Sequence, residues 1–122
     1  MSNENVKFPS CGKWPLSVCS WSLRTDVQGV ADAMEQIGIG QVNLALKPAF
    51  LDNGDAYLAA VRQQQQWAIS ATTIGFFQED YSSLESIRAT GGIVPDAEWE
   101  RNREMVLRSL AITADLGLRF LS

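Results

Sequence analysis

The sequence predicts an α/β fold built on a parallel sheet. Short segments rich in β-branched and aromatic residues alternate with segments whose apolar residues recur every three or four positions. Each connection between two such strands is long enough to hold a helix, which favours parallel pairing with right-handed crossovers. The strands are expected at residues 16–21, 41–46, 67–76 and 118–122, and residues 1–15 are expected to form a polar N-terminal arm.

The first predicted helix follows the first strand. Either Thr25 or Asp26 is suited to be its N-cap, and Gly38 stands where a left-handed C-terminal cap is needed. The apolar residues between these ends are spaced as on one helical face: Val27, Val30, Ala31, Met34 and Ile37.

Two further helices follow the second and third strands. Asp55 can cap a helix over about 56–66. After a short helix within residues 80–89, Asp96 can cap a long helix that Gly117 ends. One face of this long helix carries Trp99, Val106, Leu110 and Ala114.

Composition narrows the class of protein. The chain has 122 residues, of which 46% are hydrophobic and 20% charged, so it is long enough for one globular domain. Its apolar runs fall short of the roughly 20 residues that span a bilayer. Polar residues at the start argue against export, and Cys11 and Cys19 form no CxxC pair, so a reduced cytoplasmic setting is expected.

Charge and residue usage exclude some functions. The net charge is −4 and the ten basic residues are scattered, which argues against nucleic-acid binding. The chain has no histidine. It therefore lacks the commonest general base, the commonest transition-metal ligand and any Ser-His or Cys-His pair.

Two architectures fit the order of strands and helices. One is a small open doubly wound sheet of the flavodoxin kind, which would bind a nucleotide or flavin at its strand ends. The other is the N-terminal half of a TIM (β/α)8 barrel, which ends at its fourth strand and typically needs about 250 residues in full. The sequence has no helix after residues 118–122 to cover the last strand and no phosphate loop, so the half-barrel over residues 16–122 is the fold expected.

Three stretches resemble a known family. They are "SVCSWSLR", "IGIGQVNLAL" and, most distinctively, "TGGIVPD" before the long helix that leads to "LGLRFL". Together they resemble the opening of the sugar phosphate isomerases/epimerases, which are xylose isomerase-like TIM barrels. The resemblance implies a divalent-metal enzyme that moves a proton between carbons beside a carbonyl. It also implies that the metal ligands come from later strands, so this chain supplies none of them and needs no cofactor by itself.

Three residues at predicted strand ends are candidates for substrate binding. Trp21 can pack on the apolar C–H face of a sugar or simply plug the mouth of the barrel. Lys47 can meet a phosphate or carboxylate, or be a solvated loop lysine. Phe76 ends the third strand beside the same edge.

Two loop motifs favour structural roles. Glu79 and Asp80 are adjacent acids that could bind a hard cation, but a pair supplies too few ligands and Asp80 can instead cap the next helix. Gly91 and Gly92 permit a sharp turn and do not form a dinucleotide-binding motif. No catalytic residue and no metal ligand is therefore expected in this chain.

The functional hypothesis is an N-terminal fragment of a metal-dependent sugar or sugar phosphate isomerase/epimerase-like protein, inactive alone. Its ligand would be a small sugar or sugar phosphate, with no membrane partner. The alternative is a non-catalytic half-barrel module that self-associates or complements a partner through exposed sheet edges.

Overall fold

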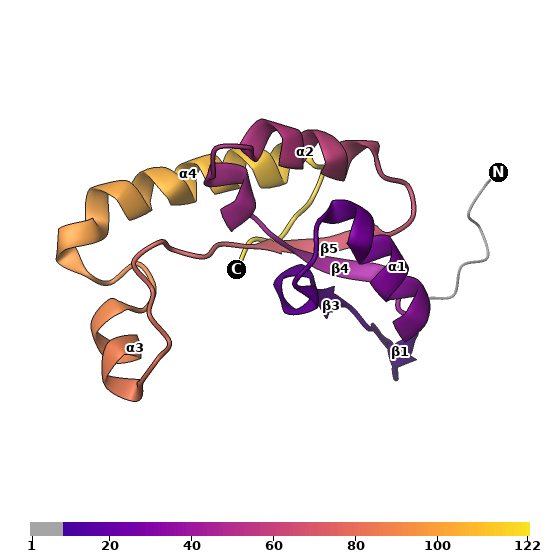
Figure 1. Cartoon of the computed structure of the whole chain (residues 1–122), viewed down its shortest axis with the longest axis horizontal. Helices are drawn as coiled ribbons and strands as arrows, with labels where there is room; N and C mark the ends of the chain where they lie inside the picture. The colour runs from indigo at the N-terminus through magenta and orange to yellow at the C-terminus, as the bar shows by residue number, and fades with distance from the viewer. Residues whose placement is uncertain (1–8) are drawn as a thin grey trace.

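The computed structural model describes residues 9–122, and Figure 1 shows how their helices and strands are arranged. The strands and 3-10 helices are β1 (Ser10–Cys11), β2 (Trp14–Pro15), β3 (Val18–Cys19), η1 (Ser20–Leu23), β4 (Gln41–Ala45), η2 (Lys47–Phe50), β5 (Ala68–Thr73) and η3 (Asp96–Glu98). The α-helices are α1 (Val27–Ile37), α2 (Gly54–Gln63), α3 (Leu84–Thr90) and α4 (Trp99–Asp115).

The strands form two separate sheets. β1 and β2 pair antiparallel, with Cys11 opposite Trp14. The other sheet is parallel and has the order β3-β4-β5. The end of the chain lies beside β5, where Leu121 forms a single parallel bridge to Thr72.

The prediction of the N-terminal half of a TIM barrel is wrong. Residues 9–122 form a small α/β fold with one antiparallel pair and one parallel sheet of three strands. The segment 118–122 contributes a single bridge and not a full fourth strand. The first strand shortens to Val18–Cys19, because η1 begins at Ser20 and the Ser20 hydroxyl accepts a hydrogen bond from the Ala45 N–H at 2.8 Å. The side chain of Ser20 thus takes the place of a backbone partner at the end of β4.

The arm expected over residues 1–15 is described only in part. Residues 1–8 lie outside the described residues, and the hairpin of β1 and β2 occupies most of residues 9–15. The Leu16 N–H donates to the Pro9 carbonyl at 2.7 Å and so closes this hairpin beside β3.

The caps of α1 match the sequence prediction, whereas the predicted N-caps of the later helices are wrong. The N-cap of α4 is Glu98 and not Asp96, which begins η3, and the N-cap of α3 is Ser83 and not Asp80. Asp26 is the N-cap of α1, and its carboxylate accepts a hydrogen bond from the Gly29 N–H at 2.8 Å. Gly38 ends α1 with φ of 78°, as predicted for a left-handed cap. The cap of α2 is Asn53 and not Asp55, which lies in the first turn of the helix.

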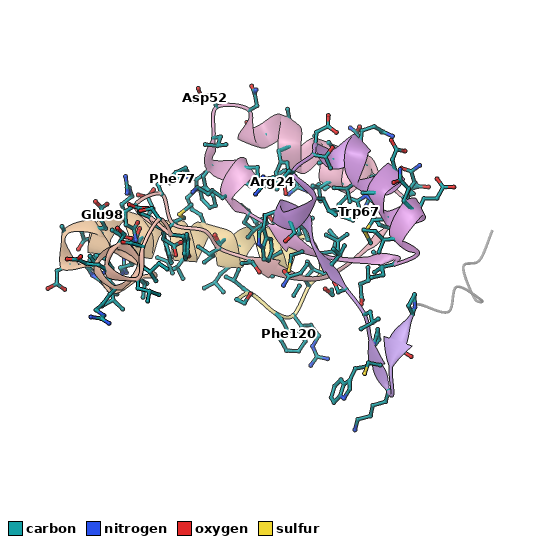
Figure 2. The ribbon with its side chains drawn as sticks, turned by 60° about the horizontal axis from the view of Figure 1, so that its bottom comes forward. Arg24, Asp52, Trp67, Phe77, Glu98 and Phe120 are labelled. Atoms are coloured by element: carbon teal, nitrogen blue, oxygen red, sulfur yellow. The ribbon has the colours of Figure 1, made fainter. Side chains whose placement is uncertain are left out.

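The core lies on the side of the parallel sheet that faces α1 and α2. β4 alternates buried and half-buried residues, and its buried side chains, Val42 and Leu44, pack with Val30 and Met34 of α1 and Val61 of α2. At the end of the chain Phe120 projects away from the helices (Figure 2). Within the described residues, none of the helices has both the length and the apolar character needed to cross a membrane.

Helix α3 stands apart from the sheet (Figure 1) and has no buried residue. Helix α4 contributes to the fold through an unusual set of buried residues, namely Asn102, Met105, Ser109 and Thr113. The face predicted from the sequence is the more exposed one, since Trp99 and Leu110 are about half exposed.

Candidate functional site

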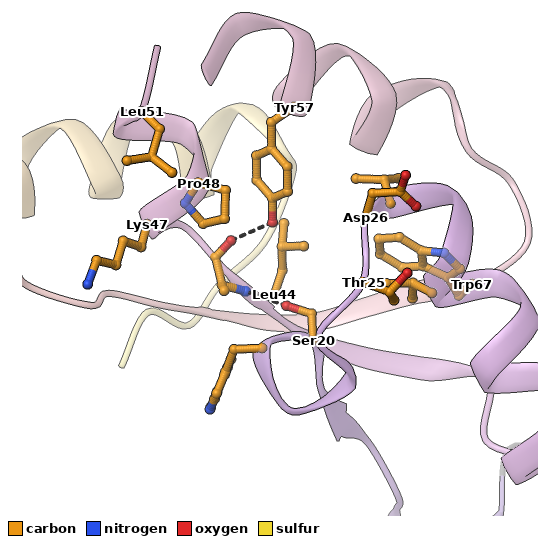
Figure 3. A pocket seen from close by; sticks show the side chains of 13 residues that line it. Ser20, Thr25, Asp26, Leu44, Lys47, Pro48, Leu51, Tyr57 and Trp67 are labelled. Atoms are coloured by element: carbon orange, nitrogen blue, oxygen red, sulfur yellow. Dashed lines mark hydrogen bonds between the residues drawn. The ribbon is translucent and has the colours of Figure 1, made fainter. Parts of the chain in front are cut away.

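A cavity of about 250 Å³ lies where β3 and β4 end. Its walls come from η1 with the start of α1 and from η2 with the start of α2 (Figure 3). The lining is mostly apolar and aromatic, and consists of Ser20, Trp21, Thr25, Asp26, Val27, Val30, Leu44, Ala45, Lys47, Pro48, Leu51, Tyr57 and Trp67. The carboxyl ends of parallel strands are where α/β folds place their ligands.

The first wall is fixed by the turn from η1 into α1. Arg24 adopts a left-handed conformation with φ of 51°, which reverses the chain after η1. The Thr25 side chain then lies against Gly29, so closely that a Cβ at Gly29 would be 1.8 Å from the Thr25 hydroxyl oxygen. This contact sets Thr25 and Asp26 at the edge of the cavity.

The second wall depends on a close approach of two backbones. A Cβ at Gly54 would lie 2.0 Å from the carbonyl oxygen of Ala49, so α2 can begin against η2 only with glycine at this position. The Gly54 N–H also donates to the Leu51 carbonyl at 2.9 Å. Pro48 and Leu51, which line the cavity, are held in place by this junction.

Two side chains form hydrogen bonds with Ala45, the last residue of β4, which lines the cavity. The Tyr57 hydroxyl donates to the Ala45 carbonyl at 2.6 Å, and the Ala45 N–H donates to the Ser20 hydroxyl at 2.8 Å. Burial raises the pKa of Tyr57 to about 12, so this hydroxyl remains a donor at neutral pH. The Ala45 peptide is thus bound by both walls (Figure 3).

A wider groove of about 920 Å³ opens beside the cavity and shares six of its lining residues. Beyond the shared residues, it adds two phenylalanine rings, the Asp52 carboxylate and two side-chain amides. The full lining is Thr25, Asp26, Val27, Gln28, Pro48, Phe50, Leu51, Asp52, Asn53, Ala56, Tyr57, Ala60 and Phe77. Apolar surface inside and polar groups at the rim are the ordinary composition of a small-molecule site.

Two of the three residues predicted for substrate binding line the cavity. Trp21 is 46% exposed at its edge, and Lys47 lines it through a side chain that extends away from Tyr57 (Figure 3). The Lys47 ammonium lies 5.2 Å from the centroid of the Phe77 ring. Phe76 is buried and lines neither space, whereas its neighbour Phe77 lines the groove.

Tyr57 and Trp67 are site residues that the sequence did not single out. Tyr57 lies one turn into α2, and Trp67 lies just before β5, so neither ends a strand. The only sequence signal for Tyr57 is its place on the same helical face as the buried Val61, four residues later.

The two loop motifs are joined to one another by hydrogen bonds. The Glu79 carboxylate accepts hydrogen bonds from the Phe76 N–H at 2.6 Å, the Gly92 N–H at 3.3 Å and the Tyr81 hydroxyl. Partial burial by itself raises the pKa of the Glu79 carboxyl, but these bonds and the charge of Lys47 together outweigh burial, so the pKa lies below its usual value.

The second acid of the pair has a local role. The Asp80 carboxylate accepts a hydrogen bond from the Ser82 N–H at 2.9 Å, and the Asp80 N–H donates to the Thr90 hydroxyl at 2.9 Å. The Gln78 amide donates to the Gly92 carbonyl at 2.8 Å, so the "QED" and "TGG" segments lie side by side. Across residues 9–122, no three Cys, Asp or Glu side chains come together as metal ligands.

Comparison of the chain with protein-family models, with curated proteins and with solved structures gave no match.

Proposed function

We propose that the chain binds a small sugar or sugar derivative in the cavity and the groove beside it. The observation that carries this proposal is the pairing of aromatic walls with rim carboxylates and amides at the ends of β3 and β4. A sugar ring has apolar C–H faces that pack on aromatic rings, and hydroxyls that need hydrogen-bond acceptors at the edge.

The size and the composition of the site both support a ligand of this class. The cavity of about 250 Å³ is close to the lower end of ligand pockets, and the groove extends it toward solvent. Trp21 and Tyr57 provide flat apolar surface. Asp52 and Asn53 provide oxygen acceptors on the groove side.

Binding, and no reaction step, is assigned to these residues. The isomerase or epimerase chemistry that the family resemblance implies requires a divalent cation. The described acids do not gather as its ligands, and Glu79 is held by the loop that it closes. Residues 9–122 therefore do not fit that cation on their own.

The proposal is tested by titrating neutral pentoses and hexoses while the tryptophan fluorescence and saturation-transfer NMR spectra are recorded. Trp21→Ala should weaken binding by about 3- to 10-fold, because it removes one stacking surface. Trp14→Ala is the matched control, since Trp14 is exposed in the hairpin and lines neither space. Equal affinity of Trp21→Ala and the unmodified chain, or no binding of any sugar, would refute the proposal.

Self-association is a second candidate function. β3 is an edge of the parallel sheet and is only two residues long, so the backbone there is open to pairing with another chain. Sedimentation velocity at rising protein concentration tests this candidate. A dimer fraction that rises with protein concentration is expected, and a single concentration-independent species would rule out association.

A further inference from the structure

The charges that line the groove are all of one sign. Asp26 and Asp52 line it, and none of the described lining residues is basic. The Asp26 carboxylate is fixed there as the cap of α1, because one of its oxygens accepts the Gly29 N–H. Asp52 lies at the exposed tip between η2 and α2. An anionic ligand would meet two carboxylates at this rim.

Two cations lie against aromatic rings that line the groove, Phe77 and Phe50. Lys47 lines the cavity and not the groove, and its ammonium lies 5.2 Å from the centroid of the Phe77 ring. The Arg108 guanidinium lies 4.8 Å from the centroid of the Phe50 ring. Each cation therefore lies against an aromatic ring of the groove wall, and neither side chain is among those that line the groove.

We infer that the site selects neutral and amino sugars and discriminates against phosphorylated ones, with Asp26 and Asp52 as the residues that set this preference. The inference rests on the proposed function and narrows its ligand class. Carboxylates at the rim accept hydrogen bonds from sugar hydroxyls and pair with an ammonium, but they repel a phosphate dianion. Of the two roles considered for Lys47, contact with a phosphate in the groove is not supported, because its ammonium lies against the Phe77 ring and its side chain does not line the groove.

The test compares three ligands that share one ring: glucose, glucosamine and glucose 6-phosphate. Their affinities for the full chain are measured by saturation-transfer NMR titration at low salt. Glucose 6-phosphate should bind about tenfold more weakly than glucose, and glucosamine at least as tightly as glucose. Added salt should reduce both differences, because the rim carboxylates are exposed to solvent.

Charge-neutral variants separate this effect from loss of fold. Measured relative to glucose in the same variant, Asp52→Asn should strengthen glucose 6-phosphate binding by about threefold and weaken glucosamine binding by a similar factor. Asp26→Asn should act in the same direction, because asparagine keeps the helix cap. Asp55→Asn is the matched control, since Asp55 lies nearby in the first turn of α2 but does not line the groove.

The outcomes are distinct. If none of the three sugars binds, the proposed function fails and the inference falls with it. If glucose binds and glucose 6-phosphate binds equally well or better, the proposed function stands and the charge preference is overturned. The preference is also overturned if Asp52→Asn and Asp55→Asn give the same affinities.

Discussion

The junction of η2 and α2 yields the sharpest prediction, because Gly54 has no room for a side chain. In Gly54→Ala the new Cβ would lie 2.0 Å from the Ala49 carbonyl oxygen and 2.7 Å from the carbonyl carbon. Both atoms belong to the backbone, so no side-chain rotation relieves the contact. The start of α2 must move away from η2.

The magnitude comes from two opposing effects. Forcing extra atoms into a packed contact costs roughly 1–3 kcal/mol. Replacing glycine by alanine inside a helix raises the free energy of unfolding by up to about 1 kcal/mol. The gain is smaller at Gly54, which is the first residue of α2. We expect a net loss of roughly 2 kcal/mol in the free energy of unfolding, together with weaker sugar binding, because Pro48 and Leu51 move with η2.

The assay is urea denaturation followed by tryptophan fluorescence, with sugar titration on the same samples. Ala59→Gly is the control, because Ala59 is half-buried in the same helix and lines neither the cavity nor the groove. If Gly54→Ala were as stable as the unmodified chain and bound sugar equally well, the close approach of the two backbones would not be a constraint on this fold.

Three other predictions concern single hydrogen-bonding groups. Because burial raises the pKa of Tyr57 to about 12, the unmodified chain should lose about 2 kcal/mol of stability as the pH rises from 10 to 12, a loss that Tyr57→Phe escapes in alkaline urea titrations. The fully buried Thr72 hydroxyl lies 2.7 Å from that of Thr113, so a double-mutant cycle with valine should give a coupling energy of about 1 kcal/mol, and additive losses would contradict the contact. The lowered pKa of Glu79 means that its contribution to stability is present above its ordinary pKa and lost as the pH falls through the lowered one. After solvent screening that contribution is below about 1 kcal/mol, and Glu79→Gln should remove this acid dependence from limited proteolysis of residues 76–92.

The elements that were predicted well are those with strong local signals. Asp26 was one of two N-caps considered for α1, and the structure selects it. The spacing of Val30 and Met34 and the cap at Gly38 are confirmed. β4 was likewise predicted within one residue, because its alternation of buried and half-buried side chains is visible in the residue types. These signals act within a few residues, so a single sequence reveals them.

The elements that were missed depend on contacts between distant residues. The first strand stops at Cys19 because the Ser20 hydroxyl binds a peptide 25 residues later. In α4 the apolar residues Trp99 and Leu110 predicted the wrong face. The buried face carries threonine and serine, and the Thr113 hydroxyl donates to the Ser109 carbonyl at 2.7 Å and meets Thr72 of β5. Such pairs leave no periodic pattern to detect.

The candidate site was predicted only where it coincides with strand ends. Trp21 and Lys47 were found in that way, and both line the cavity. Phe76 was chosen by the same rule, but the chain turns there and Phe77 faces the groove instead. Tyr57 reaches the site from the interior of a helix, so no rule based on strand ends could have found it.

The doubly bound peptide of Ala45 makes the site observable at a single atom. Its N–H is shielded by the Ser20 hydroxyl, which belongs to one wall, while its carbonyl is held by Tyr57 from the other. Exchange of this amide with deuterated solvent requires η1 to lift away from β4, and it needs no dye or label. The exchange rate of the Ala45 amide therefore measures how often the empty site opens, and its slowing on addition of a ligand measures how far that ligand holds the site closed.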